Sequence, residues 1–465
     1  MKRILVLVLA LAMLAALVGC GAEPAPAPAP TAEPAPAPAP AADPFKAAMP
    51  KEIYAEAAEV NPEGKTIDVL IVVDMQKDFV DGSLGTAEAV AIVPNVVAKI
   101  EQYKKDGGLI LATKDTHEEG YLETQEGVNL PVEHCFINTP GWELDAAVLA
   151  AMPEDAEIFN KPTFGSKDLV GYIGGLVAEY GEPYVNVELI GVCTDICVLS
   201  NSLLLKAFYP EMPISLDASC CAGVTPFKHD AAIESMRSCQ IQVTNYEYPT
   251  IVEAVAPVDP LISRQPSAIY ADAEAANPDG ESIEVLLVID MQKDFVDQAL
   301  GTAEAVEIVP AVVAKINEYK ERGAVIIATR DTHEESYMDT QEGANLPVVH
   351  CVKDTDGWLL NTDVAAALEG YDKFSYIDKP TFGSTDLVKV MGEYVKQYGE
   401  PNVKVEIIGL CTDICVVSNA LIEKAFYPEM PIILDAKCCA GVSVETHNAA
   451  LATMKCCQIG VYNEE

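Results

Sequence analysis

The amino-acid sequence repeats itself once, and this duplication constrains the fold more than any other feature. The segment 69–89 (VLIVVDMQKDFVDGSLGTAEA) returns as 285–305 (VLLVIDMQKDFVDQALGTAEA), at an offset of 216 residues. Further along, 191–198 (GVCTDICV) returns as 409–416 (GLCTDICV), at an offset of 218. Solenoid repeats recur every ~20–50 residues, so a period of this length is that of a whole duplicated domain.

Two copies of one domain follow from this period, and we place them at residues 52–250 and 267–465. Between them, segment 251–266 contains three prolines and no hydrophobic period, which is typical of a linker. Within each copy, short apolar runs such as 67–73 alternate with segments of helical period such as 87–105. Strands that are apolar throughout are typical of parallel sheets, which are buried on both faces. The predicted fold class is α/β, a three-layer αβα domain with a central parallel sheet, duplicated in tandem.

The first 51 residues differ from both copies. Two basic residues precede an apolar run that ends at Val18, as in a secretory signal. The run closes with the letters LVGC, which resemble the lipobox of bacterial lipoproteins. We therefore expect a signal peptide at 1–19, a lipidated Cys20 and a Pro/Ala-rich extended spacer over 20–51. This predicts an extracytoplasmic protein anchored to the bacterial membrane by lipid alone; the alternative is an ordinary secretory signal.

Composition argues against a nucleic-acid-binding protein. Asp and Glu number 71 against 30 Lys and Arg, which gives a formal net charge of -41 at pH 7. A surface this acidic repels phosphate backbones, so nucleic acid is not an expected partner. Half of the residues are hydrophobic, as in globular domains that bury a core. The expected partner is a small-molecule substrate, and the two copies are expected to pack as an internal pseudo-dimer.

Ionisable side chains follow predicted strands, where parallel sheets bind ligands. Asp74 ends the first strand of its copy, and Asp290 is its counterpart. A carboxylate in this position is costly unless it has partners, although it could also cap the next segment. Lys161 and Lys379 begin the shared segment KPTFGS and supply a cation to each copy.

Each CTDIC motif offers two candidate nucleophiles. Cys197 and Cys415 fall in the first turn of a predicted helix, where backbone amides and the helix dipole favour a thiolate. Cys193 and Cys411, four residues earlier, compete for this role. A buried, inert thiol is the structural alternative. With an Asp and a Lys at other strand ends, either cysteine completes a base, cation and nucleophile set for acyl transfer.

Only six histidines occur, three in each copy at matching positions. Asp115 and His117 follow a strand at a spacing of two, so they point to the same side. Together with His134 they form a set that suits Zn²⁺, Fe²⁺ or Mn²⁺ with positions left open. Glu126 is the best candidate for a further carboxylate ligand, with Glu123 in reserve. The second copy repeats the set as Asp331, His333, His350 and Glu342, with Asp339 in reserve.

Together, VVDMQKDF, KPTFGS and GVCTDICV resemble the isochorismatase-like cysteine hydrolases, and both copies match. The segments around His117 and His134 are similar to the metal-binding segment of the nicotinamidases. The resemblance implies that Asp74 takes the thiol proton, Cys197 attacks an amide carbonyl and Lys161 positions the aspartate. In the second copy these are Asp290, Cys415 and Lys379.

The resemblance also implies how the substrate is held. The backbone N–H groups of Cys193 and Cys197 (Cys411 and Cys415) would form an oxyanion hole, with a non-proline cis peptide before Cys193. One divalent metal per domain, with Zn²⁺ expected, would hold the pyridine nitrogen of nicotinamide. Phe79 and Phe295 match the aromatic residue of the substrate pocket.

Some positions depart from the nicotinamidase pattern. Leu130 replaces a tryptophan before the second metal histidine, and Ile196 replaces an aromatic residue just before the nucleophile. The first expectation is a nicotinamidase that acts through a Cys thioester. Another small-amide or ureide C–N hydrolase of the same superfamily is the alternative, and a non-catalytic surface lipoprotein that binds a metal or small ligand is the third.

Overall fold

The computed structural model of the chain describes residues 61–246 and 280–464. The predicted signal peptide, Cys20, the spacer and the linker lie outside the described residues. Over the two described ranges, no helix has both the length and the apolar character that a membrane crossing requires. The two described ranges belong to one compact unit.

Each repeat is built around a six-stranded sheet whose strands all run parallel. The strand order is β3-β2-β1-β4-β5-β6 in the first repeat and the matching β9-β8-β7-β10-β11-β12 in the second. The strands of the first repeat are β1 (Ile67–Val73), β2 (Leu109–Asp115), β3 (Glu157–Lys161), β4 (Val185–Val192), β5 (Ile214–Ala222) and β6 (Gln242–Thr244). Those of the second are β7 (Ile283–Ile289), β8 (Val325–Asp331), β9 (Phe374–Lys379), β10 (Val403–Leu410), β11 (Ile432–Ala440) and β12 (Gly460–Tyr462). The predicted fold class, two tandem αβα domains with parallel sheets, is confirmed.

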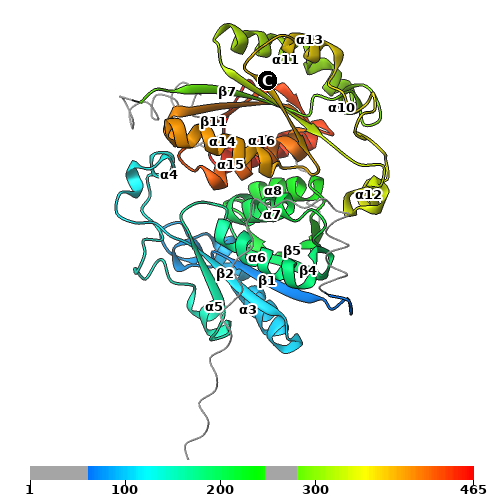
Figure 1. Cartoon of the computed structure of the whole chain (residues 1–465). Helices are drawn as coiled ribbons and strands as arrows, with labels where there is room; N and C mark the ends of the chain where they lie inside the picture. The colour runs from blue at the N-terminus through cyan, green and yellow to red at the C-terminus, as the bar shows by residue number, and fades with distance from the viewer. Residues whose placement is uncertain (1–60, 247–279, 465) are drawn as a thin grey trace, which may run out of the picture. The chain divides into compact units, whose positions relative to one another are not determined.

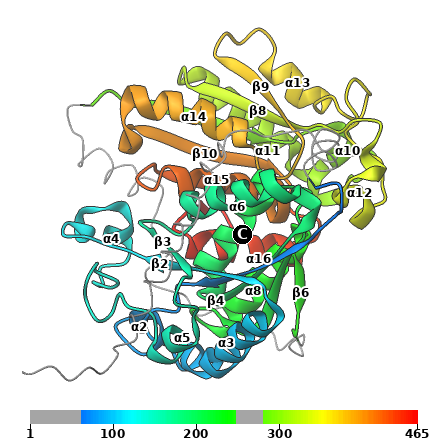
Figure 2. The same ribbon diagram turned by 60° about the horizontal axis from the view of Figure 1, so that its bottom comes forward.

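Helices flank both sheets (Figures 1 and 2). In the first repeat they are α2 (Lys77–Val80), α3 (Ala87–Asp106), α4 (Gln125–Asn129), α5 (Ala146–Ala151), α6 (Lys167–Tyr180), α7 (Leu199–Phe208) and α8 (Pro226–Ser238). In the second they are α10 (Lys293–Val296), α11 (Ala303–Glu321), α12 (Gln341–Asn345), α13 (Thr362–Leu368), α14 (Thr385–Tyr398), α15 (Val417–Phe426) and α16 (Val444–Cys456). Helix α3 starts where the Thr86 side chain accepts a hydrogen bond from Ala89 N, and it ends at Gly107 in the left-handed conformation.

The strand order fixes where a ligand can bind. The chain leaves β1 toward β2 on one side, and β4 returns to pair with β1 on the other. A crevice therefore opens beyond the carboxyl ends of β1 and β4, where the order reverses. Asp74 directly follows β1, and Cys193 directly follows β4.

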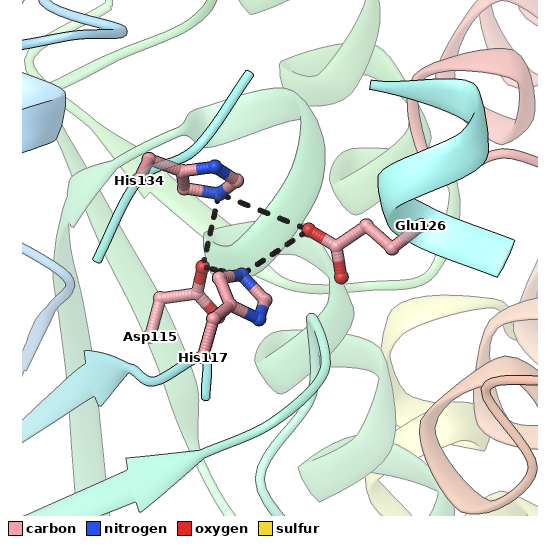
Figure 3. Close-up of side chains that lie close together, drawn as sticks. All are labelled: Asp115, His117, Glu126 and His134. Carbon is pink, nitrogen blue, oxygen red and sulfur yellow. Dashed lines mark ion pairs between the residues drawn. The ribbon is translucent and has the colours of Figure 1, made fainter. Parts of the chain in front are cut away.

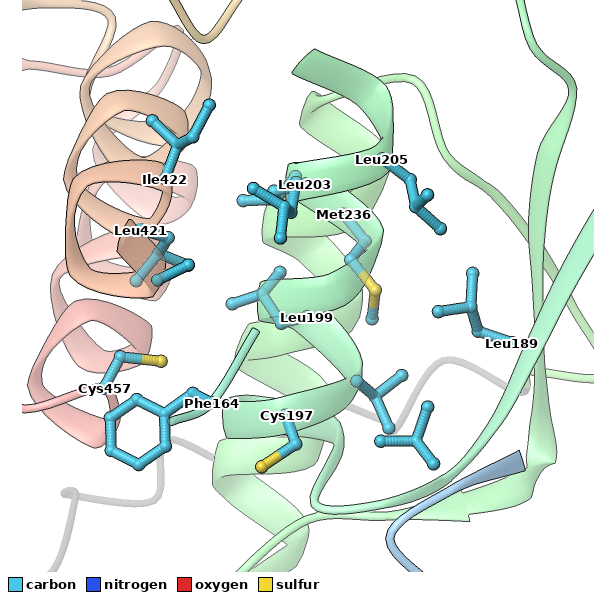
Figure 4. Packing of buried hydrophobic residues seen from close by; sticks show 14 of the residues in the cluster. Phe164, Leu189, Cys197, Leu199, Leu203, Leu205, Met236, Leu421, Ile422 and Cys457 are labelled. Atoms are coloured by element: carbon cyan, nitrogen blue, oxygen red, sulfur yellow. The ribbon is translucent and has the colours of Figure 1, made fainter. Parts of the chain in front are cut away.

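The centre of the core is apolar on both faces of the sheet. Residues Val69–Val73 of β1 have no exposed surface, as expected for a central parallel strand. All ten residues of α7 are buried as well. One side of α7 packs on its own repeat, and the other packs against α15 of the second repeat, where Leu421 and Ile422 lie (Figure 4). A helix covered on all sides in this way needs no polar face.

Candidate active site

Asp74 lies at the carboxyl end of β1 and is fully buried with a positive φ of 48°. Thr113 Oγ1 donates a hydrogen bond to its Oδ1 at 2.7 Å, and Lys161 Nζ lies 2.6 Å from its Oδ2. Burial raises the pKa of this carboxyl group, although the ammonium of Lys161 opposes the shift. A carboxylate with a raised pKa is a better proton acceptor, which suits a general base.

Lys161 joins the charged groups of the site. It ends β3, which pairs with β2, and its ammonium is almost completely buried. Besides Asp74, its Nζ lies 3.2 Å from Asp115 Oδ1 and 3.4 Å from Cys197 Sγ. Burial lowers the pKa of a lysine, but the carboxylates of Asp115 and Asp74 outweigh it and hold this pKa well above its usual range. The side chain is therefore a fixed positive charge between two carboxylates and a thiol.

Cys197 belongs to a π-helical turn, Thr194–Val198, that leads into α7. The sequence predicts that Cys197 lies in the first turn of an α-helix, and the structure has a π-helical turn there instead. The expected cis peptide between Val192 and Cys193 is confirmed, and Leu410–Cys411 has the same form. The contact with Lys161 favours Cys197 over Cys193 as the candidate nucleophile.

The predicted lowering of the thiol pKa is wrong for the protein without substrate or metal. Burial raises the pKa of Cys197 well above its usual range; Lys161 opposes this shift, and Asp74 adds to it. The helix dipole favours a thiolate at this turn, but the loss of hydration of the buried thiolate outweighs it. Deprotonation of this thiol therefore needs an adjacent base.

Four side chains meet beside this triad and form a candidate metal centre (Figure 3). His117 Nε2 lies 3.0 Å from Asp115 Oδ2 and 3.5 Å from Glu126 Oε1. His134 Nε2 lies 3.5 Å from the same Asp115 oxygen and 3.9 Å from the same Glu126 oxygen. One atom from each residue thus falls within a 4.8 Å cluster, a donor set of two imidazoles and two carboxylates. The reserve candidate Glu123 is exposed and lies outside the cluster.

The orientation of the imidazoles fits a cation. His134 Nδ1 lies 2.8 Å from Val132 O, which fixes the proton on Nδ1 and leaves the Nε2 lone pair facing the cluster. The buried Nε2 atom of His117 has no well-oriented hydrogen bond in spite of its short approach to Asp115. Asp115 and Glu126 together raise the pKa of His117 to about 10 against the effect of burial. The cluster therefore attracts a positive charge, which a divalent metal would supply in place of a proton.

The second repeat reproduces this arrangement. Lys379 Nζ lies 2.7 Å from Asp290 Oδ2 and 3.4 Å from Cys415 Sγ. The corresponding metal set is Asp331, His333, Glu342 and His350. In it, His333 Nε2 lies 2.8 Å from Asp331 Oδ2 and 3.5 Å from Glu342 Oε1. The reserve candidate Asp339 is exposed, like its counterpart.

Gln76 supports the metal ligands, and the sequence reasoning missed it. Its side chain is fully buried and makes three hydrogen bonds. The amide Nε2 donates to Asp115 O at 2.8 Å and to Trp142 O at 2.9 Å, and Oε1 accepts from Asp115 N at 2.7 Å. Asp78 Oδ2 accepts from Cys135 N at 2.8 Å and so fixes the loop next to His134. Both residues belong to the repeated DMQKDF motif, which was the available signal.

A cavity of about 180 Å³ opens onto the thiol and the metal ligands of the first repeat. It is smaller than the ~300–1,000 Å³ pockets that hold drug-sized ligands, so it suits a single small ring. Phe79 lines it, with its ring 5.5 Å from that of His134, and Ile196 and Leu130 also contribute to the wall. Part of the lining comes from the second repeat, over residues 455–460. In the second repeat the Phe295 ring lies 5.4 Å from His350.

Comparisons with known proteins find the same domain family in both repeats. The isochorismatase domain profile matches residues 68–247 and again 284–462. The nicotinamidase/pyrazinamidase of Mycobacterium tuberculosis is 25% identical over 192 residues, which cover 37% of this chain and 96% of that protein. Among solved structures, a pyrazinamidase of Pyrococcus horikoshii in complex with zinc is 31% identical, with 38% of this chain and 99% of that chain covered and a TM-score of 0.33. A nicotinamidase from Bacillus subtilis is 23% identical, with 39% and 99% covered and a TM-score of 0.34.

Proposed function

The chain belongs to the isochorismatase domain family, within the cysteine hydrolases, and we propose that each repeat is a metal-assisted cysteine amidohydrolase that converts nicotinamide and water to nicotinate and ammonia. One observation carries the proposal. In both repeats a buried Asp–Lys–Cys triad lies beside a two-histidine, two-carboxylate cluster, with distances that agree between the copies to about 0.2 Å. This combination supports acyl transfer to a thiol next to a bound donor atom.

The residues of the first repeat suit the following steps. Asp74 takes the proton of the Cys197 thiol, and the thiolate attacks the amide carbonyl carbon. Lys161, which contacts both groups, keeps the aspartate ionised before the transfer and balances the charge of the thiolate. The backbone N–H groups of Cys193 and Cys197 stabilise the oxyanion. Asp74 then gives its proton to the leaving nitrogen, ammonia departs, and a thioester remains on Cys197.

Water completes the cycle. Asp74 accepts a proton from the attacking water, the C–S bond breaks, and the thiol recovers a proton as the carboxylic acid leaves. Burial favours this return because it raises the pKa of Cys197. The carbonyl oxygen stays on the acid, the second oxygen comes from water, and the nitrogen leaves as ammonia.

A divalent metal, with Zn²⁺ expected and Fe²⁺ or Mn²⁺ as alternatives, would be held by Asp115, His117, Glu126 and His134. When bound, it supplies a Lewis acid that can hold the ring nitrogen of the substrate. Phe79 lies against His134 and lines the cavity, so its ring offers an apolar surface to the substrate ring.

The cavity also supports a second candidate. Ile196 and Leu130 line it at positions where many nicotinamidases carry aromatic residues, so the ring-binding surface is more aliphatic. A different small amide or ureide fits such a wall by the same chemistry. A binding lipoprotein without catalysis would need the histidines but would have no use for the Lys161–Cys197 contact.

The predicted lipid anchor gives the proposal a location. We propose that the chain acts outside the cytoplasm, held at the membrane through Cys20, with the two repeats as an internal pair. Incorporation of labelled palmitate into the full chain, compared with a Cys20→Ala variant, tests the anchor. Label in both proteins, or in neither, contradicts it.

The experiment that tests the function measures ammonia release from nicotinamide by the chain lacking residues 1–20. The variants are Cys197→Ala, Cys415→Ala and the pair combined, with Cys220→Ala as a matched control at a buried thiol outside the site. We expect each single variant to keep the turnover of one repeat, and the double variant and chelator-treated protein to lose nearly all of it. Full activity in the double variant contradicts the mechanism. No turnover of nicotinamide by folded, metal-loaded protein contradicts that substrate and moves the search to other amides.

A further inference from the structure

Helix α4, which carries the metal-ligand candidate Glu126, is held by residues of the other repeat. Gln125 N donates to Glu429 Oε2 at 2.7 Å, and Gln125 Nε2 donates to Glu429 O at 3.2 Å. Lys424 Nζ donates to Gln125 Oε1, and Lys424 is buried near the end of α15. The residue directly before the metal ligand is therefore fixed by three hydrogen bonds across the repeats.

A turn of the second repeat holds the same helix from its other end. Gln458, between α16 and β12, accepts a hydrogen bond from Asn129 Nδ2 at 3.2 Å and donates to the backbone oxygen of Glu126 at 3.4 Å. This turn also lines the cavity of the first repeat. One segment of the second repeat thus contacts α4, which carries Glu126, and also lines the cavity next to the thiol of the first repeat.

The reverse contacts exist for the second metal set. Gln341, which precedes Glu342, donates to Glu211 Oε2 at 2.7 Å and to Glu211 O at 3.2 Å. Lys206 donates to Gln341 Oε1, as Lys424 does to Gln125. Asn345 Nδ2 donates to Gln240 Oε1 at 3.1 Å. The distances agree between the two sets, so the same arrangement occurs twice in the molecule.

These contacts matter because α4 is too short to hold its own position. It has five residues, and an isolated helix of this length is not stable in water. Its own repeat caps it through the Thr124 side chain, which accepts from Gly127 N. The other three metal-ligand candidates sit at the end of β2 and in the loop fixed by Asp78, so Glu126 is the ligand whose position depends most on outside support.

We propose that each repeat positions the metal-ligand glutamate of the other. Lys424, Glu429 and Gln458 are positioning residues for the metal centre of the first repeat, and Lys206, Glu211 and Gln240 serve the second. The proposal rests on the metal site of the proposed function and adds that neither site is complete within its own repeat. Residues that support metal ligands in this way typically account for ~10–100-fold in metal affinity.

Matched variants at the two turns test the proposal in the full chain. His333→Ala with His350→Ala first removes the second metal set, so that only the first can bind. Gln458→Gly is then compared with Gln240→Gly in this background. Both glutamines have a positive φ, 60° and 59°, so glycine removes the side chain without backbone strain.

The readouts are Zn²⁺ affinity by competition with a coloured chelator and the visible absorption spectrum of bound Co²⁺. We expect Gln458→Gly to bind Zn²⁺ ~10–100-fold more weakly and to change the Co²⁺ spectrum, and Gln240→Gly to match the parent. With the first set removed instead, by His117→Ala and His134→Ala, the effects should exchange. The Co²⁺ spectrum distinguishes the loss of the glutamate ligand from a general loosening of the interface between the repeats. Loosening of the interface alone leaves the set of ligands around bound Co²⁺ unchanged.

Three outcomes overturn the proposal. Equal affinity in the two glycine variants overturns it, and so does an equal loss in both, since that would reflect the interface as a whole. A parent that binds no metal although its circular dichroism is that of a folded protein overturns it together with the metal site. None of these measurements uses a substrate. The metal-binding result can therefore be interpreted even if the protein does not hydrolyse nicotinamide.

Discussion

Lys161→Met removes the only lysine of the first triad and tests whether its buried charge organises the site. Lys161 and Asp74 lie 2.6 Å apart, with side chains 1% and 0% exposed. Lys77 and Asp81 also lie 2.6 Å apart, but their side chains are 50% and 52% exposed. Lys77→Met is therefore a control with the same substitution and the same distance, and it differs in burial.

The expected magnitudes differ strongly. Breaking a buried ion pair costs about 3–5 kcal/mol, because the remaining charge stays desolvated without a partner. An exposed pair contributes only about 0–1 kcal/mol. In Lys161→Met the buried carboxylate of Asp74 would lose its cation while the carboxylate of Asp115 still repels it, which places the loss at the upper part of the range for a buried pair.

The pH dependence has a definite sign. The folded pKa of Asp74 already lies above its unfolded value, and loss of Lys161 raises it further because this lysine opposes the shift. A group with a raised folded pKa contributes stability that is present below its unfolded pKa and lost as pH rises through its folded pKa. The deficit of Lys161→Met against the parent should therefore shrink as the pH falls from 7 toward 4.

Urea unfolding of metal-free protein measures these free energies. The chain has two tryptophans, Trp142 in the first repeat and Trp358 in the second, so fluorescence reports on both. Adding Asp74→Asn to Lys161→Met should recover part of the loss, since it removes the carboxylate that has lost its cation. If Lys161→Met costs no more than Lys77→Met at pH 7, the buried charge does not organise the site and the reasoning fails.

Three further predictions follow from the same geometry. Gln76→Ala removes three buried hydrogen bonds to backbone groups, so it should cost about 2–4 kcal/mol in urea unfolding and weaken Zn²⁺ binding in titrations; unchanged Zn²⁺ affinity would show that the network does not support Asp115. Because His117 has a pKa of about 10 without metal, Zn²⁺ binding at pH 7 must displace its proton. The apparent Zn²⁺ affinity should therefore rise about tenfold per pH unit between pH 6 and 9. Calorimetry in buffers of different ionisation enthalpy measures the number of protons released, and an affinity that does not change with pH contradicts the assignment of His117 as a ligand. The thiol of Cys197, whose pKa is raised by burial, should react slowly with iodoacetamide at pH 7 and faster as pH rises, whereas fast labelling at pH 7 would indicate a thiolate.

The fold and the residues of the site could be predicted because they leave local signals. Apolar runs with ionisable residues at their ends indicate a buried parallel strand and the edge at which ligands bind. This pattern led to Asp74, Lys161 and Asp115, and the structure brings all three together. The choice of Glu126 over Glu123 also agrees with the geometry, because only Glu126 faces the two histidines.

The electrostatics of the site could not be predicted from the sequence. A position near a helix terminus can be recognised in the sequence, whereas the pKa of Cys197 depends mainly on how much water the fold removes around it. Two of the three hydrogen bonds of Gln76 reach Asp115, 39 residues along the chain, and the third reaches Trp142, 66 residues along it. The contacts between the repeats join positions 105 to 332 residues apart in the chain and leave no periodic pattern in the sequence.

The two repeats share their reacting groups but differ around the cavity. Lys228, Cys456 and Gly460 line the cavity of the first repeat. At the offset of 218 residues their counterparts are Thr446, Ser238 and Gln242. Two of these three positions flank the turn that each repeat presents to the other, so a change in one repeat alters the cavity of its neighbour while the triad stays intact. In such an arrangement the residues that react differ from those that contact the rest of the substrate. We therefore expect the same reaction at both thiols, and we expect the two sites to prefer substrates that differ in the part farthest from the amide.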